Sequence, residues 1–458
     1  MEAMRKTVNM LSGPIAPGLL YLSVPIMVLN LTQSLFNTID MTTLKTYDIG
    51  NGTAVGAVGV CGTLITLITG LVIGISTGAS VTVAKSIGRD DPEGVERSIS
   101  SAMAFSLVSG AGLALIGISC AKLFLRWVNC PDGLLDQATL YFKLYFAGVP
   151  ISMVYNFCVV ILRASGDSNR PTAFAIIGGI TKVVFTYIFI AMFQMGVRGV
   201  GLATIVSSST SLFLCLWTLI RSKSVVRIRI SKIRFYKTEV FQILYIGVPD
   251  GLQRSMYAVA NVFISATVNT FGQEATTGVS IANNFDGILY QLCTATAAAL
   301  TPYVSQNVGR GNIKRAGKSV STAIMITACI GVFFGSLSAL FSRQLSSLMS
   351  SDPVTIAYSR QKMIIISTTY FICGINDIFA AALRGMGRPI PSTVSALVYF
   401  CGLRFAWVYF VFPLIPNLTF LYLSWPVSWM LSIVTLLPFY FSAVKKLQGT
   451  VSTPLASP

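Results

Sequence analysis

The sequence contains no histidine. This absence removes the commonest general base and the commonest nitrogen ligand for metal ions in proteins. The nine cysteines are scattered and no two stand at CxxC spacing, so we interpret them as small apolar residues. No glycine-rich loop of the Walker type occurs, so direct use of ATP is not expected. We therefore predict that the chain is not an enzyme and needs no cofactor.

Charged residues are also scarce. They make up 11% of the 458 residues, and apolar residues make up 53%, whereas a soluble globular chain carries about 25% charged residues. The charges avoid a series of apolar runs, each of which is long enough to cross a hydrocarbon layer of about 30 Å as a helix. Helices are expected because backbone groups in lipid must be satisfied internally. We predict an all-α integral membrane protein with twelve transmembrane helices, at residues 15–40, 53–80, 98–121, 138–162, 171–195, 199–220, 240–268, 275–302, 319–341, 361–383, 390–412 and 418–442.

The net charge of +17 is unevenly distributed along the chain. With the N-terminus inside, 22 of the 33 basic residues fall in predicted cytoplasmic segments and 7 fall outside, with Lys362 among the outside residues. This asymmetry follows the positive-inside rule, so it argues against nucleic-acid binding and predicts that both termini are cytoplasmic. The first apolar run is too long for a signal peptide, and we interpret it as an uncleaved span. We expect a multi-pass protein of the cell (plasma or inner) membrane.

The chain contains an internal repeat. Gly88-Arg89 recurs as Gly309-Arg310, and Leu162-Arg163-x-x-Gly166 recurs as Leu383-Arg384-x-x-Gly387, at the same offset of 221 residues. A repeat of six helices keeps its orientation, so we expect two six-helix bundles related by a pseudo-two-fold axis along the membrane normal. The predicted parts are an N-terminal lobe (1–220), a basic cytoplasmic linker (221–239), a C-terminal lobe (240–445) and a cytoplasmic tail (446–458).

Short motifs occur in a fixed order along the chain. They are Pro25 and Asp40; Gly74-x-x-x-Gly78 followed by Gly88; Leu162-Arg163-x-x-Gly166-Asp167 with Pro171; Gly247-x-Pro249; Ser305-Gln306-Asn307-x-Gly309; and Leu383-Arg384-Gly385-x-Gly387. With this ordered set the chain resembles the multidrug and toxic compound extrusion family over about residues 15–440.

The resemblance implies a V-shaped antiporter of twelve helices. Such proteins export amphipathic, often cationic organic compounds in exchange for protons or sodium ions. The chain departs from the family pattern at Lys182 and in the acid-free stretch Tyr257–Asn261, which leaves the coupling ion and the substrate range open. The alternative is a flippase for lipid-linked precursors or a dedicated exporter of one natural product. We expect a monomer whose partners are a small organic substrate and the bilayer.

Polar residues share one face of the first predicted span. Asn30, Gln33, Asn37 and Asp40 follow one another at helical spacing. A charge in the middle of a bilayer is costly, so we predict that this face lines a cavity of the first lobe. A carboxylate there could take up a proton, or could hold a sodium ion or a cationic drug. Asp40 is therefore the predicted coupling residue, and a helix-end cap or hydrogen-bond anchor is the structural alternative.

A similar face is predicted in the second half. Asp250, Arg254, Tyr257 and Asn261 lie on one side of span seven, and Asp250 and Arg254 are expected to form an ion pair one turn apart. The tyrosine and the asparagine are candidates for substrate or cation binding.

Two more carboxylates lie within predicted spans. Asp286 in span eight and Asp377 in span ten are candidate proton or sodium sites of the second lobe. Asp377 also lies two turns from Arg384, so a local structural pair is an alternative for it.

Two basic residues are nearly repeat equivalents. Lys182 in span five and Arg404 in span eleven are separated by an offset of 222 residues. Each could neutralise a carboxylate of its own lobe, which is Asp40 for Lys182 and either Asp377 or Asp286 for Arg404. Long basic side chains can also reach the membrane interface without a partner.

Overall fold

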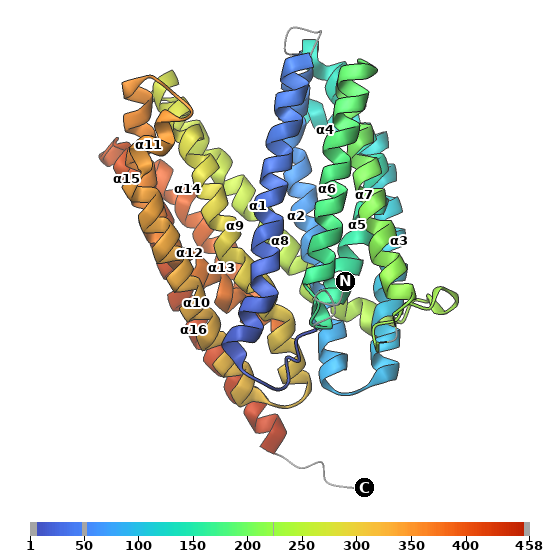
Figure 1. The fold of residues 1–458 in the computed structure, drawn as a ribbon. Coiled ribbons are helices and arrows are strands. Elements are labelled where there is room, and N and C mark those ends of the chain that lie inside the picture. The colour runs from blue at the N-terminus through green and yellow to red at the C-terminus, as the bar shows by residue number, and fades with distance from the viewer. Residues whose placement is uncertain (1–6, 48–52, 223, 453–458) are drawn as a thin grey trace. The chain divides into compact units, whose positions relative to one another are not determined.

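The computed structural model describes residues 7–47, 53–222 and 224–452. All regular structure in these residues is helical, and they contain no β-strand. Figure 1 shows that the long helices run side by side within their bundles. The prediction of an all-α membrane protein is confirmed.

Twelve long helical stretches follow one another in the described residues, joined by short turns and by the small helices α4 (Ala121–Trp127) and α11 (Ser342–Ser347). Ten of them are long and apolar enough to cross a membrane, while α8 and α9 are equally long but richer in polar residues. The stretches are α1 (Ile15–Tyr47), α2 (Thr53–Gly88), α3 (Pro92–Ser119), α5 (Asp132–Ala164), α6 (Asn169–Tyr187) continued by η2 (Ile188–Met192), α7 (Val197–Ile220), α8 (Lys237–Asn269), α9 (Gln273–Gly309), α10 (Ile313–Leu340), α12 (Pro353–Gly385), Ile390–Leu414 and Leu418–Gly449.

Many helices begin earlier than hydropathy predicts, because side chains outside the apolar runs cap them. The carboxylate of Asp91 accepts a hydrogen bond from the backbone nitrogen of Gly94 at 2.8 Å and starts α3. Asn312 caps α10 in the same way. Asp352 caps α12, and its hydrogen bonds with Thr355 hold the pKa of the Asp352 carboxyl below its usual value, so the cap stays ionised.

The contacts of the chain divide it into two compact units. One unit contains residues 7–8 and 28–247, and the other contains residues 9–27 together with residues 248–452. Apart from the boundary before α1, the division therefore falls within α1 and within α8. The lobe limits predicted at 220 and 240 stay a prediction.

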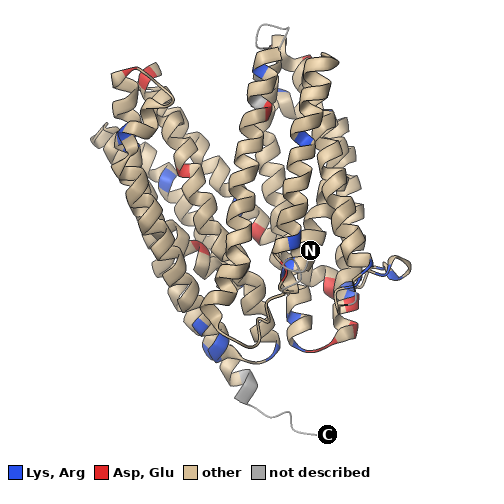
Figure 2. Ribbon diagram, in the orientation of Figure 1, with Lys and Arg blue, Asp and Glu red and all other residues tan. Residues whose placement is uncertain are grey.

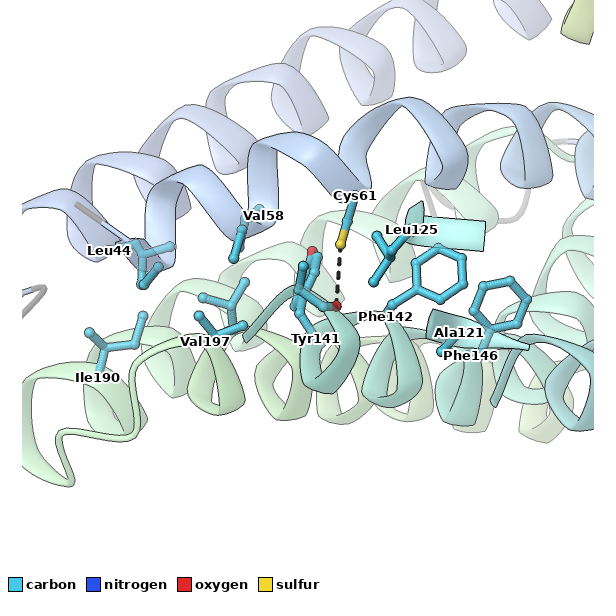
Figure 3. Close-up of a cluster of buried hydrophobic side chains, with 14 of the residues drawn as sticks. Leu44, Val58, Cys61, Ala121, Leu125, Tyr141, Phe142, Phe146, Ile190 and Val197 are labelled. Carbon is cyan, nitrogen blue, oxygen red and sulfur yellow. Dashed lines mark hydrogen bonds between the residues drawn. The ribbon is translucent and has the colours of Figure 1, made fainter. Parts of the chain in front are cut away.

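A buried apolar cluster fixes the end of the first unit that carries Asp40. Phe142 and Phe146 of α5 lie with their ring centroids 4.7 Å apart, and the thiol of Cys61 on α2 donates to the carbonyl of Ala138 at 3.4 Å (Figure 3). Leu44, one turn beyond Asp40 on α1, is buried in this cluster. Ile190 of η2 joins it as well. The cluster thereby holds α1 and α6 against α2 and α5.

The basic linker (221–239) packs against the helices of the first unit. Its residues alternate, so that Val226 and Ile228 are buried in a core cluster with α3 and α5, while Arg227 and Arg229 are exposed. Glu96 on α3 forms ion pairs with Arg229 at 3.2 Å and with Lys232 at 2.7 Å. The linker is therefore packed onto the first unit. Figure 2 shows charges at this linker, whereas most of the length of the long helices consists of uncharged residues.

Two glycines let α2 and α8 approach closely. A Cβ atom at Gly247 would lie 2.6 Å from the Cα of Ile75, and a Cβ at Gly78 would overlap the carbonyl of Ile243. Gly78, the second glycine of the Gly74-x-x-x-Gly78 motif, thus makes a close helix packing contact.

Substituting Gly247 by valine is expected to lower the free energy of unfolding by about 1–3 kcal/mol, because the added atoms must push α8 away from α2. Thermal unfolding in detergent, followed by tryptophan fluorescence, measures the effect. Gly112→Val is the matched control, since a Cβ at Gly112 meets no atom within 4 Å. Equal melting temperatures for the two variants would contradict the close crossing.

Candidate functional site

Asp40 is the buried carboxylate of the first unit. It lies on α1 with 5% of its surface exposed, and its Oδ2 forms an ion pair with Nζ of Lys182 on α6. The hydroxyl of Thr186, one turn further along α6, donates to Oδ1 of Asp40 at 3.0 Å. Lys182 also donates to Oδ1 of Asn37 at 3.5 Å. The ion pair that we expected between Asp40 and Lys182 is therefore present.

The other polar residues of this α1 face are less enclosed. Gln33 and Asn37 are exposed and Asn30 is half-buried within the first unit. Helix α1 continues for almost two turns beyond Asp40, to Tyr47, so the interpretation of Asp40 as a helix-end cap is wrong. An anchoring role through Lys182 and Thr186 is compatible with the contacts.

The carboxylate of Asp250 in the second unit has two arginine partners. Nε of Arg254 lies 3.2 Å from Oδ2, which confirms the predicted ion pair within α8. Nη1 of Arg384 on α12 lies 2.9 Å from Oδ1. The suggested pair between Asp377 and Arg384 is not observed, because α12 brings Arg384 to Asp250 instead.

Lys362 is the functional candidate that the sequence analysis missed. It was predicted to lie outside the membrane, but it lies inside α12 with 3% of its surface exposed. Nζ lies 3.2 Å from Oδ2 of Asp286 on α9 and donates to the side-chain oxygen of Asn283. The proposal that Arg404 neutralises Asp286 is therefore wrong. The residues Asp352 and Pro353 at the start of α12 were the available signal, since they place Lys362 more than two turns inside a helix.

Asp377 is buried without an ion pair in the described part of the chain. The hydroxyl of Tyr257 donates to Oδ1 of Asp377 at 3.3 Å, and Nδ2 of Asn376 lies 3.5 Å from the same oxygen. The hydroxyl of Ser432 donates to Asn376 at 2.6 Å and fixes its amide. Tyr257 thus belongs to the site of the second unit. Asn261 is exposed one turn further along the same helix.

Arg404 has no carboxylate partner among the residues that the structure describes. Its Nε and Nη2 both donate to the hydroxyl of Ser428 at 3.3 Å. The guanidinium carbon lies 5.4 Å from the ring centroid of Phe400 and 5.2 Å from that of Trp425. Arg404 stands between two π-helical segments, Ala396–Leu403 and Trp407–Val411, which are frequent at functional sites. Neither pairing proposed for Arg404 is observed.

The acidic sites are built from single carboxylates. Over the described ranges, no three side chains of histidine, cysteine, aspartate or glutamate gather in a way that could hold a metal ion. Asp40 and Asp377 have neutral oxygen or nitrogen groups beside them. A proton needs one carboxylate only, whereas a sodium ion would draw on these neutral oxygens as further ligands.

The described residues contain twelve long helical stretches with buried charges, which is the architecture of a multi-pass membrane protein. The family model described as MatE matches residues 25–188 and 249–410. The chain therefore belongs to the MatE family, in agreement with the resemblance that its motifs suggested.

Known proteins of similar length match most of the chain. The probable multidrug resistance protein YpnP of Bacillus subtilis is 26% identical over 400 residues, covering 87% of this chain and 89% of that protein. The FAD transporter of Shewanella oneidensis is 22% identical, covering 85% and 86%. A structure described as the outward-facing conformation of a multidrug resistance MATE family transporter has a TM-score of 0.88 at 21% identity, covering 97% of this chain and 100% of that chain. This likeness establishes the fold.

Proposed function

We propose that the protein is a cation-coupled antiporter that exports amphipathic, often cationic organic compounds by alternating access. It acts as a monomer in the cell membrane, with both termini in the cytoplasm. Protons or sodium ions that enter the cell drive the export. The relatives that carry the name multidrug resistance protein support the choice of substrate class.

One observation carries the proposal of cation coupling. Asp377 is a buried carboxylate that hydrogen bonds to neutral groups and has no ion pair in the residues described. A buried charge without a partner is strongly unfavourable, so a proton or a bound cation is the natural way to neutralise it. The charge of Asp377 therefore depends on the ion that the transporter binds.

Asp40 contributes to coupling in another way. Its charge is already balanced by Lys182, so a proton or a cation at Asp40 must compete with the lysine. Protonation of Asp40 would release Lys182 and leave its half-buried charge without a counterion. The first unit thus has two charge arrangements of different stability, which is the property that a switch requires.

Replacing Asp377 by asparagine is expected to abolish gradient-driven export, because an amide neither binds a proton nor attracts a cation. The measurement is efflux of ethidium from proteoliposomes under an imposed proton or sodium gradient. Asp352→Asn is the matched control, since Asp352 caps α12 outside the span. Efflux by the Asp377→Asn variant at the rate of the parent would refute coupling at this residue. No gradient-driven efflux of any tested compound by the parent would refute the exporter proposal.

A further inference from the structure

The buried charges of the second unit are almost all accounted for by partners. Asp286 is paired with Lys362, and Asp250 is paired with Arg254 and Arg384. Asp377 has no ion pair in the described residues, receives a hydrogen bond from Tyr257 and is the proposed site of the coupling ion. The remaining buried charge is a cation with no carboxylate partner among the described residues.

That cation is Arg404, of whose surface 2% is exposed. A guanidinium carries five N–H donors, and the described partner of Arg404 is one hydroxyl, that of Ser428, which is shared by Nε and Nη2. The rings of Phe400 and Trp425 lie near the guanidinium. An aromatic face attracts a cation but does not accept the directed hydrogen bonds of its N–H groups.

Asp377 does not serve as the counterion of Arg404. Oδ1 of Asp377 accepts a hydrogen bond from the hydroxyl of Tyr257. The ring of Tyr257 stacks on Phe400 at a centroid distance of 4.6 Å. A series of contacts therefore runs from Asp377 through the rings of Tyr257 and Phe400 to Arg404. The guanidinium of Arg404 is buried beside aromatic rings and has no anionic partner in the described residues. Its planar set of N–H donors is therefore suited to bind the oxyanion of a ligand.

We propose that Arg404, with Ser428, Phe400 and Trp425, binds the carboxylate or another oxyanion of a planar aromatic substrate. This inference rests on the proposed export function and widens it from cations to aromatic anions and zwitterions. The guanidinium and the Ser428 hydroxyl bind the oxyanion, and the aromatic side chains contact the ring of the substrate. Binding supplies the negative charge that Arg404 lacks.

The first half does not repeat this arrangement. The offset of 222 residues that relates Lys182 to Arg404 places Gly178 opposite Phe400 and Ala203 opposite Trp425. Lys182 also has its own anion, Asp40. At the equivalent position the first unit therefore has neither the two aromatic residues nor an unpaired cation, so packing common to both halves does not account for the arrangement around Arg404.

Two xanthene dyes of opposite charge test the proposal. Fluorescein is a planar aromatic anion, and a rhodamine ester has the same ring system as a cation. Fluorescence anisotropy with the purified full-length protein measures the dissociation constant of each dye. The parent is expected to bind both dyes.

Arg404→Gln is expected to raise the dissociation constant for fluorescein at least about tenfold, which is typical of the loss of a charge-assisted hydrogen bond. The constant for the rhodamine ester is expected to change by less than about twofold. Arg404→Lys keeps the charge but loses the planar set of N–H donors, and Trp425→Leu removes one aromatic ring. Both are expected to weaken fluorescein binding less than Arg404→Gln does. They also test the site if Arg404→Gln fails to fold. Arg360→Gln, at an exposed arginine of the same unit, is the control.

Three outcomes overturn the inference. In the first, the parent does not bind fluorescein. In the second, the Arg404 and Trp425 variants raise the dissociation constants of both dyes equally. In the third, none of these variants changes the dissociation constant for fluorescein. The proposed export function is tested separately by rhodamine efflux. If the parent exports the rhodamine ester but does not bind fluorescein, this inference fails and the export function stands.

Discussion

Replacing Lys362 by methionine is expected to lower the free energy of unfolding by about 3–5 kcal/mol. The methionine fills most of the space of the lysine stem but leaves Asp286 buried without its cation. A buried charge of this kind is among the most unfavourable changes that a single substitution can make. Thermal unfolding in detergent, followed by tryptophan fluorescence at constant lipid content, measures the loss.

A double variant separates charge from packing. If the loss comes from the unpaired carboxylate, Lys362→Met combined with Asp286→Leu should recover most of the stability, because no buried charge remains. Lys122→Met is the control, since Lys122 pairs with Asp136 on the surface, and no measurable change is expected for it. A double variant that is less stable than Lys362→Met alone would show that the ion pair itself stabilises the second unit.

Replacing Asp40 by asparagine is expected to reduce gradient-driven efflux of ethidium to the level of liposomes without protein. Asparagine keeps the size of the side chain and its hydrogen bond with Thr186, but it does not balance Lys182 or exchange a proton. Lys182 and the incoming cation would then no longer compete for the carboxylate of Asp40. Efflux under proton and sodium gradients, measured separately, also identifies the coupling ion.

Variants of the partners define the role of Asp40 further. Thr186→Val removes one hydrogen bond and leaves the charge, so a partial reduction of efflux is expected. Asp40→Asn combined with Lys182→Met removes both charges, and we expect it to fold as well as the parent while remaining uncoupled. Full activity of Asp40→Asn would leave only an anchoring role for Asp40 and would assign coupling to the second unit.

The fold could be predicted from the sequence because the bilayer imposes simple requirements on length and polarity. Apolar runs of sufficient length predict twelve long helices, and the described residues contain twelve long helical stretches, ten of which are apolar enough to cross a membrane. The 221-residue offset indicates two similar halves. The boundaries were less accurate, since capping residues such as Asp91 and Asp352 start helices several residues before the apolar run. Hydropathy does not register such local hydrogen bonds.

The candidate site could be predicted only in part. The pair Asp250–Arg254 follows from helical spacing, and the pair Asp40–Lys182 was one of the two alternatives for Lys182. The partner of Asp286 was missed because Lys362, at the start of the predicted span 361–383, was counted among the outside residues, whereas it lies more than two turns inside α12 and is buried. The environment of Arg404 depends on which residues of neighbouring helices face it, and a single sequence does not contain that information.

The division of the chain inside α1 and α8 bears on how its two halves could be separated. The first half carries residues 9–27, which belong to the second unit, and the second half carries the opening turns of α8, which belong to the first. The halves therefore exchange segments, much as swapped protomers do in an intertwined dimer. A gene cut within the linker would yield two fragments that are each incomplete alone, so they should function only when they are produced together.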